Sequence, residues 1–165
     1  MIKAPLDPAL LTEARSLIHH EAALLDQRRF MEWLDLYTSD STYWIPRQRN
    51  QTDPIAVPSI IYDDHPLMAM RVKRLMHPRA YSAMPTPHTL HVVGNVEITG
   101  HGEDQDIYRV TSSQIVIEAK ENLQRVFAGS YEHVLRRTSS GLRIESKRID
   151  LVDSDSIKDV MVILL

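Results

Sequence analysis

Residues 123–137 read LQRVFAGSYEHVLRR, and this stretch decides the fold. Leu123, Phe127, Tyr131 and Leu135 share one face of an extended chain, because successive side chains of a strand point to opposite sides. Gly129 lies on the same face, and a glycine inside a strand favours a bend or a bulge. The stretch therefore predicts a long strand with one apolar face and an irregularity near its middle.

Comparable segments flank this strand on both sides. Residues 106–120 and 142–152 are also long, and only short turns at residues 121–122 and 139–141 separate them from it. Apolar and polar residues alternate over 90–98 as well. Long strands joined by short connections predict an antiparallel meander.

The last of these strands changes its apolar phase along its length. Leu142 and Ile144 lie on one face, whereas Ile149 and Leu151 fall on the other if the strand is regular. One inserted residue restores a common face, so the pattern predicts a bulge between the two pairs. Residues 99–104 contain two glycines among polar residues and predict a turn before the meander continues.

The first half of the chain predicts helices instead. Asp7 is a candidate N-cap with Pro8 at the first helical position, and apolar residues then recur at spacings of three and four up to Leu25. A second helix is expected over residues 30–37, ended by turn-forming residues at 38–41.

Shorter elements follow this second helix. Residues 42–45 predict a short strand ended by Pro46, and residues 59–62 predict another after a loop. Asp63 or Asp64 is expected to cap a helix that runs to Met76. Helices first and a meander afterwards indicate an α+β fold, which we expect to form one domain over residues 1–165.

Composition excludes several classes of protein. The 165 residues contain no cysteine, which rules out disulfides, thiolate zinc sites and cysteine-ligated iron–sulfur clusters in this chain. The net charge of −3 disfavours a nucleic-acid-binding module. No apolar run reaches the roughly 20 residues that span a bilayer, and no signal peptide is evident, so we expect a cytoplasmic protein.

Motifs that carry chemistry are scarce. The spacing His88-x-x-His91 resembles a metal-ligand pair, but residues three apart on a strand face opposite ways, so no metal site is expected there. A buried acid–base site in a cone-shaped domain would need a carboxyl group with a raised pKa. Its candidates are Asp35, Tyr37, Tyr43, Tyr62 and Asp63, although the interpretation as cap residues and surface tyrosines is favoured.

The chain ends in six apolar residues, 160–165. Exposed, this segment would favour aggregation. It is expected to be buried either as a final edge strand of its own domain or against another subunit.

Five stretches of the chain, in this order and spacing, form a recognisable pattern. They are EAALLDQRRFMEWLDLY (21–37), DSTYWIP (40–46), HVVGNV (91–96), FAGSYEHVLRR (127–137) and KRIDL (147–151). Together with Tyr62-Asp63-Asp64, Arg71 and Arg74, they resemble the small subunits of aromatic-ring-hydroxylating dioxygenases. The sequence departs from the family at residues 85–90, where the family usually has an Arg- and Ser-rich run, and at His133, where it tends to carry Asp.

The resemblance implies a cystatin-like cone, shared with ketosteroid isomerase and nuclear transport factor 2. It also implies a hetero-oligomer with a large (alpha) subunit, commonly a hetero-hexamer built on a trimer of small subunits. The large subunit would carry a Rieske [2Fe–2S] cluster and a mononuclear Fe(II), and this chain would hold neither. Candidate partner contacts are Trp44, Tyr62, Arg71, Arg74, Leu164 and Leu165.

Two functions follow as hypotheses. In the first, the chain is a non-catalytic subunit that stabilises and organises its iron-containing partner. In the second, it is a stand-alone cone-fold isomerase or dehydratase, or a small-ligand-binding protein.

Overall fold

A computed structural model describes residues 7–79, 85–102, 104, 106–156, 161 and 163–165. Three helices pack on one six-stranded sheet with the strand order β2-β1-β6-β5-β4-β3. The elements are α1 (Pro8–Asp26), α2 (Phe30–Leu34), β1 (Tyr37–Pro46), β2 (Ser59–Asp64), α3 (His65–Met76), β3 (His88–His101), β4 (Ile107–Lys120), β5 (Leu123–Thr138), β6 (Gly141–Leu151) and the 3₁₀ turn η2 (Ser154–Ser156).

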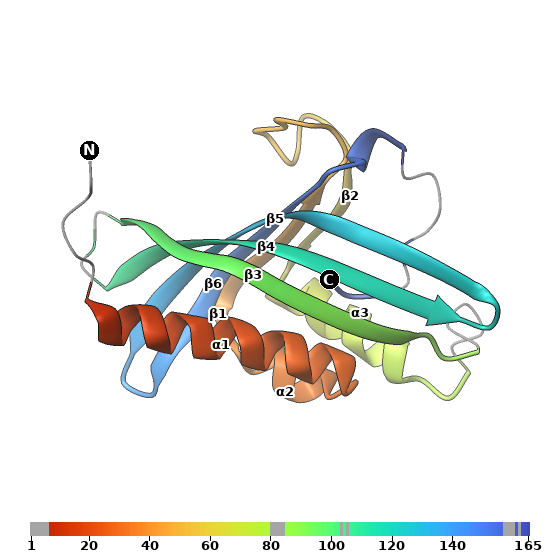
Figure 1. The fold of residues 1–165 in the computed structure, drawn as a ribbon, viewed down its shortest axis with the longest axis horizontal. Helices are drawn as coiled ribbons and strands as arrows, with labels where there is room; N and C mark the ends of the chain where they lie inside the picture. Colours follow the sequence, from red (N-terminus) through yellow and green to blue (C-terminus); the bar gives the residue numbers. More distant parts are fainter. Residues whose placement is uncertain (1–6, 80–84, 103, 105, 157–160, 162) are drawn as a thin grey trace.

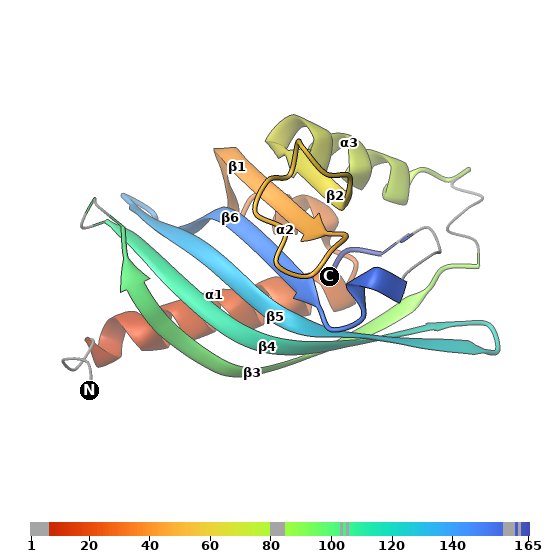
Figure 2. The same ribbon diagram turned by 90° about the horizontal axis from the view of Figure 1, so that it is seen from above.

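The sheet curves around the helices (Figures 1 and 2). Helix α1 runs beneath β3 to β6, and α3 contacts β1 and β2. Between these layers lies the core, in which Trp33, Tyr43 and Leu135 are fully buried. The α+β prediction is confirmed, and the arrangement is that of a cone closed on its inner side by helices.

Helix boundaries follow the capping signals. The Asp7 carboxylate accepts a hydrogen bond from the backbone N–H of Ala9, and Pro8 is the first helical residue, as predicted. Of the two candidate caps for α3, Asp64 is the one used, since its carboxylate accepts from the N–H of Leu67 at 2.9 Å. Asp63 turns inward instead.

The predicted turn at residues 38–41 is wrong. These residues belong to β1, which pairs in parallel with β6 and antiparallel with β2. The sheet is therefore mixed, not wholly antiparallel as the sequence suggested. Pairing with two neighbouring strands outweighs the turn preference of the Ser and Asp residues, and Asp40 is further held by Arg136 at 3.0 Å.

The meander is confirmed, but its irregularities lie in unexpected places. The predicted bulge in β6 is present. The register to β5 shifts between Val134 and Leu135, so that Glu145 has no residue directly opposite it on β5. No shift occurs at Gly129. Its missing side chain instead permits close approach, since a Cβ there would lie 2.6 Å from the carbonyl oxygen of Asp150.

Strand β3 is longer than predicted and contains two irregularities of its own. It extends through the expected turn as far as His101, and its register to β4 shifts after Gly94 and again after Ile98. Asn95, at the first shift, has a positive φ of 52°, a conformation that asparagine tolerates better than most residues. Such shifts increase local twist and help the sheet to curve.

Candidate functional site

Polar side chains from four other elements, α2, β1, β5 and β6, converge inside the cone on Glu21 of α1. Glu21 Oε1 accepts three hydrogen bonds: from Lys147 Nζ of β6 at 2.8 Å, from the Tyr37 hydroxyl at 2.7 Å and from the Trp33 indole N–H at 3.1 Å. The Nε2 atom of His133 lies 3.0 Å from Glu21 Oε2. We call Glu21, Trp33, Tyr37, His133 and Lys147 the buried polar cluster.

Water has no access to this cluster. The side chains of Glu21, His133 and Lys147 are 2%, 0% and 1% exposed. Burial alone would raise the pKa of Glu21, but the charge of Lys147 and the hydrogen bond from His133 outweigh it and lower that pKa far below its ordinary value. Burial lowers the pKa of His133, so its imidazole is neutral near pH 7.

These electrostatics argue against acid–base catalysis by Glu21. A general acid needs a raised carboxyl pKa, whereas this carboxylate is stabilised in its ionised form and already accepts four interactions. The cluster joins α1 to the two central strands β5 and β6, and its chemistry is that of a structural ion pair with hydrogen-bonding neighbours.

The five predicted acid–base candidates do not form one site. Tyr37 belongs to the cluster, and the ring of buried Tyr43 lies 5.8 Å from Lys147 Nζ. Asp63 is buried and paired with Arg71 at 2.6 Å. Tyr62 is 41% exposed, and Asp35 is an exposed residue just after α2.

Sequence reasoning missed Glu21, His133 and Lys147. Each lies in a buried register of its own element: Glu21 three residues after Ile18, and His133 two residues after Tyr131. A charged residue in an apolar phase was the available signal, but the pattern alone could not show that the three would meet across the fold.

A second buried histidine pairs with a carboxylate near the end of α1. The Nδ1 atom of His91 lies 2.6 Å from Asp26 Oδ1, and Asp26 also accepts from the backbone N–H of His91 at 2.9 Å. Exposed His88 is not part of this pair. Among the described residues, no group of three or more His, Cys, Asp or Glu side chains is placed to hold a metal ion.

Two of the predicted partner contacts lie side by side on the outer edge of the sheet. Trp44 of β1 is opposite Tyr62 of β2, and their rings are 6.1 Å apart in an edge-to-face arrangement. The guanidinium of Arg148 stacks over the Trp44 ring at 4.3 Å. On α3, Arg74 is exposed, while Arg71 is engaged by Asp63.

The terminal leucines are placed differently. Leu164 is 4% exposed and Leu165 is 0% exposed, and Met161 and Ile163 are buried with them. Among the described residues of this segment none is in a strand, so the predicted edge strand is wrong although burial within the chain is observed. These leucines therefore leave almost no surface for contact with a partner subunit.

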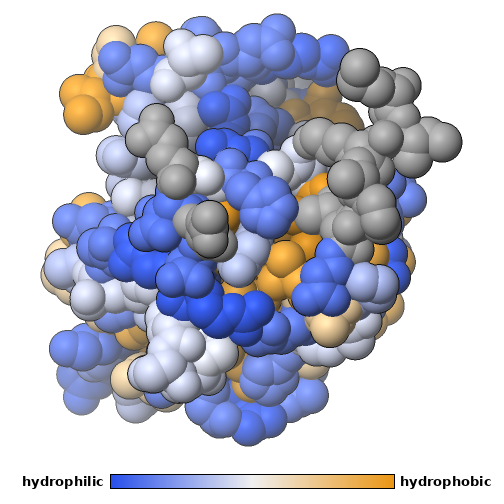
Figure 3. Space-filling model, turned by 90° about the vertical axis from the view of Figure 1, so that its left-hand side faces the viewer, coloured by the Kyte–Doolittle hydropathy of each residue, from blue (hydrophilic) through white to orange (hydrophobic). Residues whose placement is uncertain are grey.

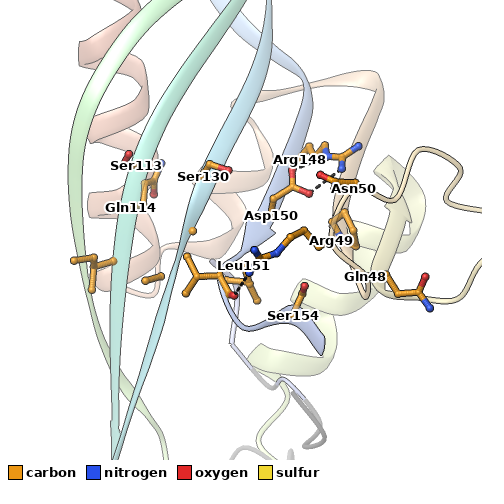
Figure 4. Close-up of a pocket in the computed structure, with 15 residues that line it drawn as sticks. Gln48, Arg49, Asn50, Ser113, Gln114, Ser130, Arg148, Asp150, Leu151 and Ser154 are labelled. Carbon is orange, nitrogen blue, oxygen red and sulfur yellow. Dashed lines mark hydrogen bonds and ion pairs between the residues drawn. The ribbon is translucent and has the colours of Figure 1, made fainter. Parts of the chain in front are cut away.

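A recess of about 700 Å³ opens on the outer face of the sheet (Figure 4). Residues Gln48–Asn50 of the loop after β1 face Arg148 and Asp150 of β6 across it. Arg148 and Asp150 bind each other at 2.6 and 2.8 Å, and Arg49 donates to the Val152 carbonyl at 3.0 Å. Its charged groups are thus engaged with one another, which suits a contact surface better than a reaction centre.

Beside this recess, the sheet exposes an apolar surface that no helix covers. Val92 and Ile115 form a cross-strand pair, and Leu90 and Val126 both pair with Ile117. Leu90, Val92, Ile115 and Val126 are 55%, 50%, 45% and 57% exposed, and we call these four residues the outer apolar patch. By contrast, hydrophilic residues dominate the end of the molecule where α1 begins, with hydrophobic ones gathered near the centre of that view and at its upper left (Figure 3).

Contiguous apolar surface of this kind marks interaction sites in soluble proteins. The described helices include none with the length and apolarity needed to cross a bilayer.

Comparison with known proteins gives a consistent picture. The family model described as the ring hydroxylating beta subunit matches residues 20–159. The beta subunit of biphenyl 2,3-dioxygenase from Rhodococcus jostii is 35% identical, over 93% of this chain and 87% of that protein.

Two solved structures share the fold. The beta subunit of benzoate 1,2-dioxygenase from Burkholderia mallei has a TM-score of 0.75 at 23% identity and covers 98% of this chain and 99% of that one. An NTF2-like protein with a cystatin-like fold from Novosphingobium aromaticivorans has a TM-score of 0.62 at 16% identity, covering 88% and 83% of the two chains. At these identities the likeness establishes the cone fold alone.

Proposed function

The chain belongs to the ring hydroxylating beta subunit family, and on this basis we propose that it is the small, non-catalytic component of an aromatic-ring-hydroxylating dioxygenase. Its role is to hold a large alpha subunit in the assembly. The relative from Rhodococcus is a subunit of a dioxygenase, so the activity belongs to the complex as an oxidoreductase.

The proposal extends to the cofactors and the stoichiometry of the complex. A Rieske [2Fe–2S] cluster and a mononuclear Fe(II) would reside in the large subunit, since a Rieske cluster needs two cysteine ligands and this sequence has none. We further propose a trimer of small subunits within a three-plus-three hetero-hexamer. A cytoplasmic location and a single domain over residues 1–165 remain predictions from the sequence.

The observation that carries the organising role is the outer apolar patch. Four large apolar side chains on neighbouring strands are about half exposed, so a substantial part of each remains uncovered by the described residues. Burying this surface against another subunit would stabilise the complex through the hydrophobic effect.

A second contact region is proposed at the edge of the sheet. Trp44 and Tyr62 lie together there, and aromatic residues are enriched at the centres of protein interfaces. Arg74 is exposed on α3, which contacts both of these strands, and we propose that it supplies a charged contact beside Arg71, which Asp63 holds in place.

The substrate is not set by this chain in the proposed arrangement. The two dioxygenase relatives are named for different aromatic compounds, biphenyl and benzoate. We propose that an aromatic compound is oxidised in the large subunit's pocket and that the described surfaces of this chain position that subunit.

Co-purification with the large subunit tests the organising role. The chain and a tagged large subunit are expressed together, and the mass of the purified complex is measured by light scattering. Ile115→Glu places a charge in the outer apolar patch and is expected to weaken assembly at least about tenfold. Met31→Glu is the matched control, because Met31 is 49% exposed on α2, away from this face, and should leave the mass unchanged. Equal masses for both variants would contradict the role given to the patch.

A further inference from the structure

The end of the chain occupies the interior of the cone. In Figure 1 the C-terminal label lies between the sheet and α3, and Leu165 is fully buried. The carbonyl oxygen of Leu165 accepts hydrogen bonds from Lys147 Nζ at 2.7 Å and from the Tyr43 hydroxyl at 3.0 Å. The backbone N–H of Leu165 lies 3.0 Å from the same hydroxyl.

This polar contact differs from the usual burial of a chain segment. Buried backbone groups are normally satisfied by neighbouring strands or helices. Here both groups of Leu165 are satisfied by side chains, one from β1 and one from β6, that are themselves fully buried. Two donors that converge on one oxygen, one of them an ammonium group, are the arrangement that binds a carboxylate or a carbonyl ligand.

Unused hydrogen-bonding capacity lies beside this contact. The ring of Tyr131 is 5.4 Å from Lys147 Nζ, and among the described residues the buried hydroxyl of Tyr131 has no hydrogen-bond partner. The Nδ1 atom of buried His133, in the same cluster as Lys147, also lacks one. Such unsatisfied groups are costly in a closed core and are typical of sites that bind ligands or ordered water.

Apolar side chains of the three helices surround Ile163 and Leu164 next to this polar contact. Ile163 and Leu164 pack against Leu25 of α1, Phe30 of α2 and Leu75 of α3, with a residual gap of only about 20 Å³ among them. The surroundings of these residues thus combine an apolar wall from three helices with a polar end at Tyr43 and Lys147.

We propose that the cone contains a binding site for an apolar ligand bearing a carbonyl or carboxylate oxygen, and that Ile163, Leu164 and Leu165 fill it as a built-in ligand. Lys147 and Tyr43 bind the oxygen, while the helices bind the apolar body. Displacing the segment opens the site to a free ligand of the same chemistry. This site is independent of the outer face that the proposed assembly uses.

Binding of the segment's own sequence in trans tests the proposal. The full chain carries Ile163→Ser, Leu164→Ser and Leu165→Ser, which removes the apolar ligand but keeps the chain length. The probe is the free peptide Ile-Leu-Leu, and fluorescence of Trp33, whose ring lies 6.0 Å from that of Tyr43, reports binding. We expect saturable binding to this variant and at least tenfold weaker binding to the unmodified chain.

Matched probes separate this site from general hydrophobic binding. Ile-Leu-isoamylamide keeps the apolar side chains and the amide N–H but lacks the terminal carbonyl group, and it should bind at least tenfold more weakly. Equal affinity for the two probes would overturn the proposal, as would absence of peptide binding by a folded triple variant or equal binding by the unmodified chain.

A second measurement covers the case in which the triple variant does not fold. Amide hydrogen exchange of Leu165 is measured in the full chain with Tyr43→Phe and with Tyr131→Phe. Tyr43→Phe removes the hydroxyl that contacts Leu165, so exchange there should accelerate at least tenfold. Tyr131→Phe removes a hydroxyl without a partner and should leave exchange at Leu165 unchanged. Unchanged exchange of the Leu165 amide in Tyr43→Phe would contradict the proposed binding of Leu165 by Tyr43.

Discussion

Glu21 is the residue on which the interior hydrogen bonds converge. It links α1 to β5 through His133 and to β6 through Lys147. Ion pairs of this kind often add little net stability compared with apolar residues, but removing one partner leaves the other buried and uncompensated.

Glu21→Gln should therefore be strongly destabilising. The substitution retains shape but leaves the Lys147 ammonium without its counter-charge, at a cost of about 3–5 kcal/mol in the free energy of unfolding. Urea denaturation measures this loss. Glu13→Gln is the control on the same helix, because Glu13 pairs with Arg137 where both side chains are over 30% exposed, and it should cost under about 1 kcal/mol. Similar losses for the two variants would refute the buried role of Glu21.

His133 gives the stability a defined pH dependence. Burial lowers its pKa below the ordinary value of 6.5, although Glu21 opposes that shift. The unfolded chain therefore binds the proton first as pH falls, so the stabilisation is complete above about pH 6.5 and is lost below it. Burial also lowers the pKa of His91, so this histidine adds to the loss of stability over the same pH range. The lowered pKa of Glu21 affects stability only at more acidic pH, below the ordinary carboxyl value of 4.5.

His133→Gln removes one of these titrations while keeping a donor near Glu21. The change in unfolding free energy between about pH 7.5 and 5.5 should become smaller by about 1 kcal/mol. Urea denaturation across this range measures it. An undiminished pH dependence would show that His133 is already protonated in the folded chain.

Among the elements, strand β5 shows what sequence could and could not predict. The length of β5, its apolar face and the turns around it follow from the alternation of apolar residues and from the turn residues. In the same way, Asp7, Pro8 and Asp64 predict where α1 and α3 begin. The parallel pairing of β1 with β6 could not be predicted, because it joins segments about a hundred residues apart and no local pattern encodes such a partner. For the same reason the meeting of Glu21 with His133 was not foreseen.

Gly129 in β5 has a structural reason that the sequence did not predict. A bulge was expected, but the structure shows regular pairing and a close approach to β6. Gly129→Ala should therefore destabilise by about 1–3 kcal/mol, since its Cβ would collide with the backbone of Asp150.

Thermal unfolding of Gly129→Ala checks this, with Gly94→Ala as the control. A Cβ at Gly94 would meet only the Ser113 carbonyl oxygen at 4.0 Å, so this strand position has room for a methyl group. Equal melting temperatures for Gly129→Ala and the unmodified chain would mean that β5 and β6 are not packed as described.

At the scale of the whole molecule, the two faces of the sheet serve different purposes. The inner face is closed by helices and the chain's own end, and its charged groups are engaged with one another. The outer face presents an apolar patch and a recess whose charged residues bind each other. We propose that such a molecule organises the assembly of a complex in which the partner subunit performs the oxidation.

Product formation per assembled complex tests this claim most directly. Hydroxylation of an aromatic compound such as biphenyl or benzoate is measured in air with an excess of an electron donor, because it consumes O2 and two electrons. The reaction is run with the chain alone, with the large subunit added, and with Ile115→Glu in place of the unmodified chain. We predict no product from the chain alone. With Ile115→Glu, the loss of product should match the loss of assembly, and turnover per assembled complex should be unchanged. Product from the chain alone, or a lower turnover in complexes that do assemble, would contradict the claim.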